Sequence, residues 1–111
     1  MKLVRAVIRE DKVADVIAAM LEAGFAGATV YKEVGGMGGE SGVVKIGGRM
    51  YEALLPRAVV EVAVEDDQVE KLIAVITAAA RTGHVGDGRI FVLPVLEAWR
   101  IRNGERLDKP K

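Results

Sequence analysis

Two glycine-rich segments and three arginines supply the residue types that bind phosphate-like anions. One segment runs from Gly36 to Gly42, and the other runs from Gly83 to Gly88 with Arg89 directly after it. Glycines leave backbone N–H groups bare and let them approach an anion closely. Arg100 and Arg102 are two residues apart, so on an extended segment both guanidinium groups face one side. The pattern is compatible with a phosphate cradle, but from spacing alone it favours the interpretation that the glycines form ordinary turns and the arginines are solvated surface.

Side chains for catalysis are scarce. The chain has no cysteine and one histidine, His84, which excludes thiolate catalysis, cysteine-based metal sites and an all-histidine metal site within one chain. Ser41 lies in a glycine run rather than at a strand-turn-helix elbow. Neither glycine segment has the sequence context of a P-loop or a Rossmann turn. The residues therefore favour a binding protein over an enzyme, with His84 read as an exposed loop residue.

Charge and composition disfavour several classes of partner. Lys and Arg number 16 and Asp and Glu number 16, and aromatic residues make up 5% of the chain. A balanced charge and few rings argue against a nucleic-acid partner and against a polybasic membrane anchor. No apolar run has the length of a membrane helix, and the first residues lack the long apolar segment of a signal peptide. We expect a cytoplasmic protein, without direct membrane insertion, whose 111 residues form one domain, 1–111.

The elements that would position these residues follow from hydrophobic periodicity. Alternation predicts strands over 2–9, about 28–34, 59–64 and 89–95. Helical spacing predicts one helix from Glu10 to Gly24 and another from Asp66 to about Gly83, each with acidic residues in its first turn. The charged tail, about 97–111, is expected to be partly mobile, with Trp99 as a packing or interface anchor.

The middle of the chain has a different character. Seven of the 13 glycines lie between Gly35 and Gly48, a density that helix and strand interiors do not tolerate. We interpret Gly35 to Pro56 as one long loop, with room for a short extended piece at 43–46. Loops of this length in compact domains are usually functional or mobile.

An internal repeat organises the predicted elements. Glu10-Asp11-Lys12-Val13 matches Asp66-Asp67-Gln68-Val69, and the apolar positions of the preceding strands and following helices match at the same offset. Two βαβ units in series predict an α+β, ferredoxin-like βαββαβ sheet whose long loop joins strands two and three. The last strand is apolar on both faces, so we expect a second subunit to cover one of them.

Four segments resemble one family, the PII nitrogen regulatory signal-transduction proteins. Thr82 to Val92, TGHVGDGRIFV, is similar to the family's signature loop and last strand, TGxxGDGKIFV. Arg100 to Glu105 resembles RIRTGE, Leu55 to Arg57 resembles LPK, and Gly36 to Gly42 resembles GFGRQKG. The resemblance covers nearly the whole chain, and the chain is identified as a divergent member.

The resemblance implies a homotrimer that binds ATP or ADP in clefts between subunits. It also implies that the long loop, called the T-loop and here about 36–56, binds a partner protein: an ammonium transporter, a metabolic enzyme or a regulator. The implied function is control of nitrogen or related carbon metabolism rather than catalysis. The alternative from another class is a small ferredoxin-like enzyme acting on a phosphate or acyl-phosphate substrate.

The resemblance also assigns nucleotide-binding residues, by their match to family positions. The positions that face the base and ribose are Thr29 and Glu61, and those that form the loop base under the phosphates are Gly36, Gly38 and Gly39. The positions that surround the phosphates are Gly86, Asp87, Gly88, Arg89, Arg100 and Arg102.

Several departures from the family pattern bear on the effector. Glu40 stands where the family has a glutamine that helps bind Mg²⁺ and 2-oxoglutarate; its carboxylate can hold Mg²⁺ but repels a dicarboxylate. Arg57 replaces the lysine that pairs with 2-oxoglutarate, and Gly39 replaces an arginine. These changes argue against conventional 2-oxoglutarate sensing. Tyr51 lies at a spacing that resembles the modified tyrosine of some members, and an insertion is apparent near Tyr31.

Overall fold

The computed structural model describes residues 1–37, 43–52 and 54–109, and of the side chains in 43–46 and 49–52 nothing is stated. Its strands and helices follow the order β1, α1, β2, β3, β4, β5, α2, β6. Their bounds are β1 Lys2–Arg9, α1 Val13–Glu22, β2 Thr29–Gly36, β3 Val43–Ile46, β4 Arg49–Glu52, β5 Leu55–Val64, α2 Val69–Ala80 and β6 Gly88–Pro94. One turn of 3₁₀ helix, Glu10–Lys12 or Asp66–Gln68, leads into each α-helix.

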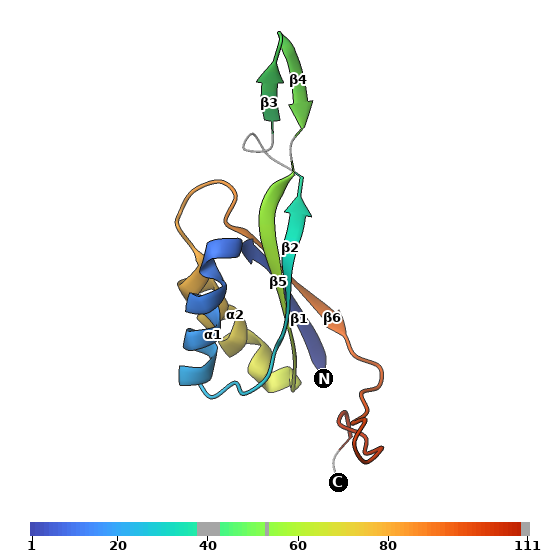
Figure 1. Cartoon of the computed structure of the whole chain (residues 1–111). Coiled ribbons are helices and arrows are strands. Elements are labelled where there is room, and N and C mark those ends of the chain that lie inside the picture. The colour runs from blue at the N-terminus through green and yellow to red at the C-terminus, as the bar shows by residue number, and fades with distance from the viewer. Residues whose placement is uncertain (38–42, 53, 110–111) are drawn as a thin grey trace.

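The main sheet has the strand order β2-β5-β1-β6, and every neighbouring pair is antiparallel. Both helices cover the same face of this sheet (Figure 1). With α1 joining β1 to β2 and α2 joining β5 to β6, this is the ferredoxin-like βαββαβ topology that the repeat predicts. The predicted α+β fold class is therefore confirmed.

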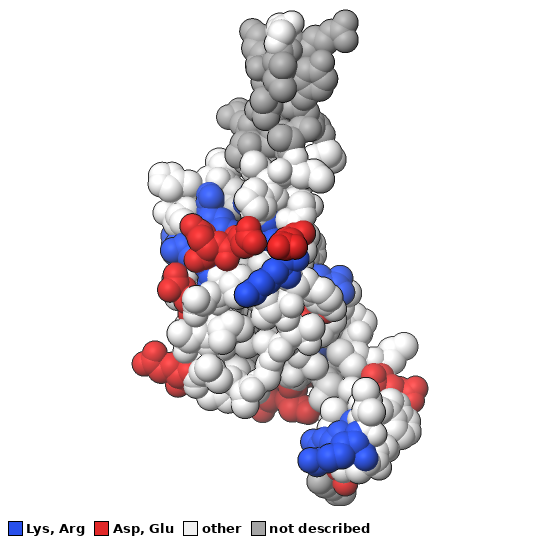
Figure 2. All heavy atoms as spheres, viewed as in Figure 1, with Lys and Arg blue, Asp and Glu red and all other residues white. Residues whose placement is uncertain are grey.

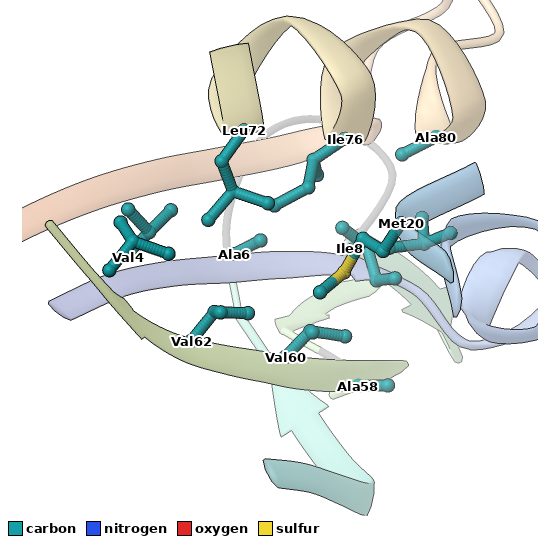
Figure 3. Close-up of a cluster of buried hydrophobic side chains, with 12 residues drawn as sticks. Val4, Ala6, Ile8, Met20, Ala58, Val60, Val62, Leu72, Ile76 and Ala80 are labelled. Atoms are coloured by element: carbon teal, nitrogen blue, oxygen red, sulfur yellow. The ribbon is translucent and has the colours of Figure 1, made fainter. Parts of the chain in front are cut away.

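The core lies between the sheet and the two helices. Alternate residues Val4, Ala6 and Ile8 of β1 face the helices and pair across the sheet with Val62, Val60 and Ala58 of β5. Met20, Leu72 and Ile76 close over them from α1 and α2 (Figure 3). Each of these large side chains contributes about 1.5–3 kcal/mol when it leaves water. The offset of 56 residues is preserved in the structure, since the helices begin at Val13 and Val69.

The opposite face of the sheet is open in the single chain. Phe91 of β6 points away from the helices and is 48% exposed, and its neighbour Val92 is 44% exposed at the sheet edge. Within one chain the helices cover only the inner face of the last strand, so the predicted cover of its outer face by a second subunit stays a prediction. Coverage of the outer face requires another molecule, and the sequence analysis expects a second subunit there.

The glycine-rich segment is not one continuous loop. β2 runs on to Gly36, where it pairs with Leu55, so β5 begins four residues earlier than the predicted strand. Beyond them, β3 and β4 form a hairpin that projects past the end of the sheet, and the molecule is 62 Å long (Figure 1). Gly47 and Gly48 both have positive φ, as a two-residue hairpin turn requires. The short extended piece at 43–46 is confirmed as β3.

The edge strand β2 contains a β-bulge. Tyr31 pairs with Val59 and Val34 pairs with Arg57, so two residues of β2 stand opposite one residue of β5. An extra residue in an edge strand is accommodated in this way, which matches the insertion apparent near Tyr31. Glu33 sits in the bulge with φ +58° and is the one residue other than glycine with positive φ in the described part of the chain.

Replacing Glu33 with glycine is expected to stabilise the fold. A left-handed backbone is unfavourable for a residue with a Cβ, and glycine removes that penalty, for a net gain of about 0.5–1 kcal/mol. Urea unfolding of Glu33→Gly measures the gain. Lys32→Gly is the matched control, since Lys32 is exposed in the same bulge without a positive φ. A loss of stability in both variants would contradict the assignment of strain to Glu33.

Residues 97–109 form a compact turn after β6. The Arg106 guanidinium lies 4.9 Å over the Trp99 ring and binds the Asp108 carboxylate, with Nε to Oδ1 at 2.7 Å. The Ala98 N–H donates to the same carboxylate at 3.0 Å. Trp99 therefore packs against the tail itself while 56% of it stays exposed. Within the residues described, no helix is long and apolar enough to cross a membrane.

Candidate functional site

A cleft of about 460 Å³ lies between the ends of β2 and β5 nearest the hairpin and the loop that precedes β6. Its walls come from Gly36 and Met37 at the end of β2, Arg57 near the start of β5, and Val7 of β1. The loop residues 84–87 and the first part of β6 complete it. The structure thus brings the described start of the first glycine-rich segment, Gly36 and Met37, beside the second segment.

The Asp87 carboxylate holds the loop 82–87 in shape. The backbone N–H groups of Thr82 and Gly83 each donate to its Oδ2 at 2.8 Å, and the Thr82 hydroxyl donates to Oδ1. Arg9 of β1 donates to Oδ1 at 3.1 Å and, through Nη2, to the Val85 carbonyl at 2.9 Å. The hydrogen bonds from Thr82 are the main reason that the pKa of Asp87 is well below its ordinary value. Asp87 is therefore a charged anchor of the loop.

Gly88 lies where the loop backbone meets β1. Its φ is +108°, and a Cβ built there would stand 1.8 Å from the Val7 carbonyl oxygen. Gly86 has φ +100°, so the two glycines give the loop a course that other residues rarely adopt. At the other wall, a Cβ on Gly36 would stand 2.8 Å from Cγ of Arg57. Gly88 thus lets the loop backbone approach β1, and Gly36 lets the Arg57 side chain approach the backbone of β2, at two walls of the cleft.

Two guanidinium groups, Arg57 and Arg89, line the cleft. Among the residues described, neither makes an ion pair; Arg57 only donates to the neighbouring Pro56 carbonyl at 3.4 Å. Guanidinium groups without a carboxylate partner, beside backbone N–H groups, suit an anion with several oxygens. The cleft has the chemistry of a phosphate or carboxylate site.

Thr29 and Glu61 lie elsewhere, paired with each other on the outer face of β2 and β5. Arg5 donates to the Glu61 carboxylate at 2.7 Å, and this hydrogen bond is the main cause of the lowered pKa of Glu61. The Tyr31 hydroxyl hydrogen bonds to the same carboxylate, which raises the pKa of Tyr31. Arg5 and Tyr31 were not predicted as partners of Glu61. Strand alternation could place them on the same outward face as Glu61, but not in register with it.

Arg100 and Arg102 also lie away from the cleft of their own chain. β6 carries the chain from the cleft to the opposite end of the sheet, where the tail begins (Figure 1). Arg100 pairs with Glu105 at 3.0 Å, and the Gly104 N–H donates to the Arg100 carbonyl at 2.8 Å. The segment is therefore a turn rather than extended, so the simple expectation that both guanidinium groups face one side does not apply.

Some predicted residues fall outside what the structure describes. Gly38, Gly39 and Glu40 lie in the undescribed stretch 38–42, so the predicted loop base and Mg²⁺ ligand are not placed. Tyr51 lies on β4, opposite Val44 of β3. The part of the chain that is described holds no cluster of three or more histidine, aspartate or glutamate side chains suited to a metal ion.

The structure combines a ferredoxin-like sheet, a cleft suited to an anion and a hairpin that projects beside the cleft, which is the architecture of a ligand-binding protein rather than of a barrel or a helical bundle. The family model described as nitrogen regulatory protein P-II matches residues 1–105. The chain belongs to the P-II family.

Individual relatives support this assignment. The chain is 44% identical, over 96% of both sequences, to the nitrogen regulatory protein P-II of Microchaete diplosiphon. It is 39% identical to the nitrogen fixation nifHD region GlnB-like protein 1 of Methanothermococcus thermolithotrophicus, over 95% of this chain and 97% of that one. Among solved structures it resembles Arabidopsis thaliana PII bound to citrate, with TM-score 0.77, 36% identity, and coverage of 95% and 83%.

The family assignment confirms the predicted class of function. The family model and the Microchaete relative are both named nitrogen regulatory protein P-II, so the chain is a regulator of the P-II type rather than an enzyme. The fold prediction drawn from the repeat and the motif prediction drawn from 82–92 converge on the same family.

Proposed function

We propose that this protein is a cytoplasmic P-II regulator that binds ATP or ADP between the subunits of a homotrimer. The observation that carries the proposal is the cleft, in which the 86–88 backbone lies beside two arginines that lack a carboxylate partner among the described residues. A nucleoside polyphosphate is the ligand whose charge and number of oxygens this arrangement suits best.

Residues from two subunits complete the proposed site. Gly36, Gly86, Gly88 and Arg89 line one chain's cleft and would contact the phosphates, with Asp87 fixing the loop. Arg100 and Arg102 lie beyond the far end of β6, so we propose that they reach the phosphates of a neighbouring subunit's nucleotide. One chain therefore carries residues of the proposed site at both ends of its sheet. This is expected when each site is formed by two subunits, each of which contributes one end.

Thr29 and Glu61 lie on the outer sheet face, and we propose that they contact the base and ribose there. This face is open in the single chain, so the same subunit contact that covers Phe91 would enclose the nucleoside. Gly38 and Gly39 are proposed to extend the phosphate site from the loop base.

We propose that residues 36–56 form the T-loop, through which the protein controls a transporter, enzyme or regulator of nitrogen or related carbon metabolism. The β3–β4 hairpin projects beyond the ends of β2 and β5 (Figure 1), and Gly36 and Arg57 at those ends line the cleft. A ligand in the cleft would therefore be well placed to alter the orientation of the hairpin. Tyr51 on β4 is proposed as a modification point. On the face shown in Figure 2, acidic and basic side chains lie together near the hairpin end, which offers no single-sign surface for a nucleic acid.

For the second effector we propose that Glu40 disfavours 2-oxoglutarate while it can hold Mg²⁺ beside the phosphates. Arg57 lines the cleft and can pair with a carboxylate. The Arabidopsis relative is described as bound to citrate, a polycarboxylate.

Isothermal titration with ATP and with ADP, each with and without Mg²⁺ and 2-oxoglutarate, tests the proposal. We expect nucleotide binding in the micromolar range that 2-oxoglutarate does not strengthen, because Glu40 repels a dicarboxylate. Enhancement by 2-oxoglutarate would overturn the role given to Glu40 and leave nucleotide binding intact. Absence of any nucleotide binding by the purified oligomer would overturn the proposed mechanism.

A further inference from the structure

His84 lines the cleft, and the proposed nucleotide site does not yet use it. Its backbone N–H donates to the Thr82 hydroxyl at 3.2 Å, so the main chain at this residue belongs to the loop that Asp87 anchors. The side chain is exposed, and its imidazole makes no hydrogen bond or ion pair with any described residue. A donor held at the wall of an anion cleft without a protein partner is available to a ligand.

The charges around His84 come from every element of the cleft. Arg57 of β5 and Arg89 of β6 line the same hollow, and Asp87 lies three residues further along the loop. Arg9 of β1 neutralises Asp87 and also holds the Val85 carbonyl. Among the described residues, neither Arg57 nor Arg89 has a carboxylate partner, and both line the cleft with His84. An incoming polyphosphate therefore reverses the sign of the electrostatic field at the imidazole.

Imidazole is the side chain that changes charge near neutral pH, whereas arginine keeps its charge throughout. A polyanion beside His84 favours the protonated ring, which can then donate a charge-assisted hydrogen bond to a phosphate oxygen. Protonation and nucleotide binding should therefore promote each other, as linkage requires.

We propose that His84 is a phosphate-contacting residue that couples nucleotide binding to proton uptake near neutral pH. This inference rests on the proposed nucleotide site and adds to it a contact and a pH dependence. Nucleotide binding should tighten as the pH falls toward 6, in addition to any effect of the phosphate's own titration.

Titration with ATP at about pH 6 and about pH 8 tests the inference, since this range spans the ordinary titration of imidazole. Wild-type protein is compared with His84→Gln, which keeps a donor without charge, and with His84→Lys, which keeps the charge at both pH values. The γ-phosphate of ATP titrates near the lower pH for all three proteins, so only the difference between them reports on His84. His84 is exposed, so both substitutions should fold normally.

The ratio of the dissociation constants at high and low pH is expected to be about fivefold larger for wild type than for either variant, which is the lower end of the usual coupling between two binding events. Wild type should also take up more protons than His84→Gln when titrations in two buffers of different ionisation enthalpy are compared. The chain has a single histidine, so its NMR ring signal should move toward the protonated position when ATP is added near pH 7.

The ratio of the dissociation constants at the two pH values could be equal in wild type and His84→Gln, with an imidazole NMR signal that does not move when ATP is added. That result would overturn the role of His84 and leave the nucleotide site standing. Failure of all three proteins to bind ATP at either pH would overturn the nucleotide site, and the inference with it.

Discussion

Replacing Arg89 with alanine is expected to weaken ATP binding by about 10- to 100-fold, which corresponds to about 1.5–3 kcal/mol for hydrogen bonds to a charged group. Arg89 follows the Gly86–Gly88 turn at the start of β6 and lines the cleft. Removing its guanidinium leaves the phosphates with one bidentate donor fewer and lowers the positive charge beside them. Isothermal titration with ATP measures the loss.

Two controls separate this effect from general ones. Arg89→Lys keeps the charge, and the family pattern TGxxGDGKIFV that this segment resembles has lysine at this position, so most of the affinity should remain. Lys32→Ala removes one exposed cation from the bulge of β2, outside the cleft, and should bind ATP normally. Arg89 is exposed and makes no ion pair with described residues, so its variants should unfold at the wild-type temperature. Unchanged affinity in a well-folded Arg89→Ala would contradict the proposed site.

The central fold was predictable because local and long-range signals agree. The alternation over 2–9, the acidic helix starts and the offset of 56 residues all appear in the observed elements. The β3–β4 hairpin was only half predicted. Each of its strands has only four residues, glycines stand on both sides of β3 and before β4, and so few positions give alternation little to act on. Its pairing depends on the turn at Gly47-Gly48 more than on the strand residues.

The motif singled out several residues that line the cleft, among them Gly86, Gly88 and Arg89, but it did not predict their arrangement. Arg9 and Asp87 are separated by 78 positions in the sequence, and only the pairing of β1 with β6 brings them together. Glu61 was selected without its partners Arg5 and Tyr31, since cross-strand contacts depend on register. The turn at Arg100 depends on its contacts with Gly104 and Glu105. The two-residue spacing of Arg100 and Arg102 does not reveal these contacts.

Gly88→Ala is expected to be the most destabilising single substitution in the cleft, at about 3 kcal/mol or more. The new Cβ would lie 1.8 Å from the Val7 carbonyl oxygen and 2.9 Å from the Val7 carbonyl carbon, and both belong to the backbone. Gly88 pairs with Ile8 in the sheet, so neither strand can move aside without breaking the β1–β6 ladder. The φ of +108° adds strain that an alanine cannot relieve in place.

Gly83→Ala is the matched control for this prediction. Gly83 lies in the same loop with φ +87°, but a Cβ there would have no atom within 4 Å. It should therefore lose only the backbone term, about 1 kcal/mol. Thermal unfolding at equal subunit concentration should place Gly88→Ala about 10 °C or more below wild type and Gly83→Ala in between.

Because the start of β6 forms the cleft wall, Gly88→Ala should also lose ATP binding while the protein is still folded. Equal stability of the two variants would show that β1 yields to the methyl group, and the close approach at Gly88 would then not define the cleft.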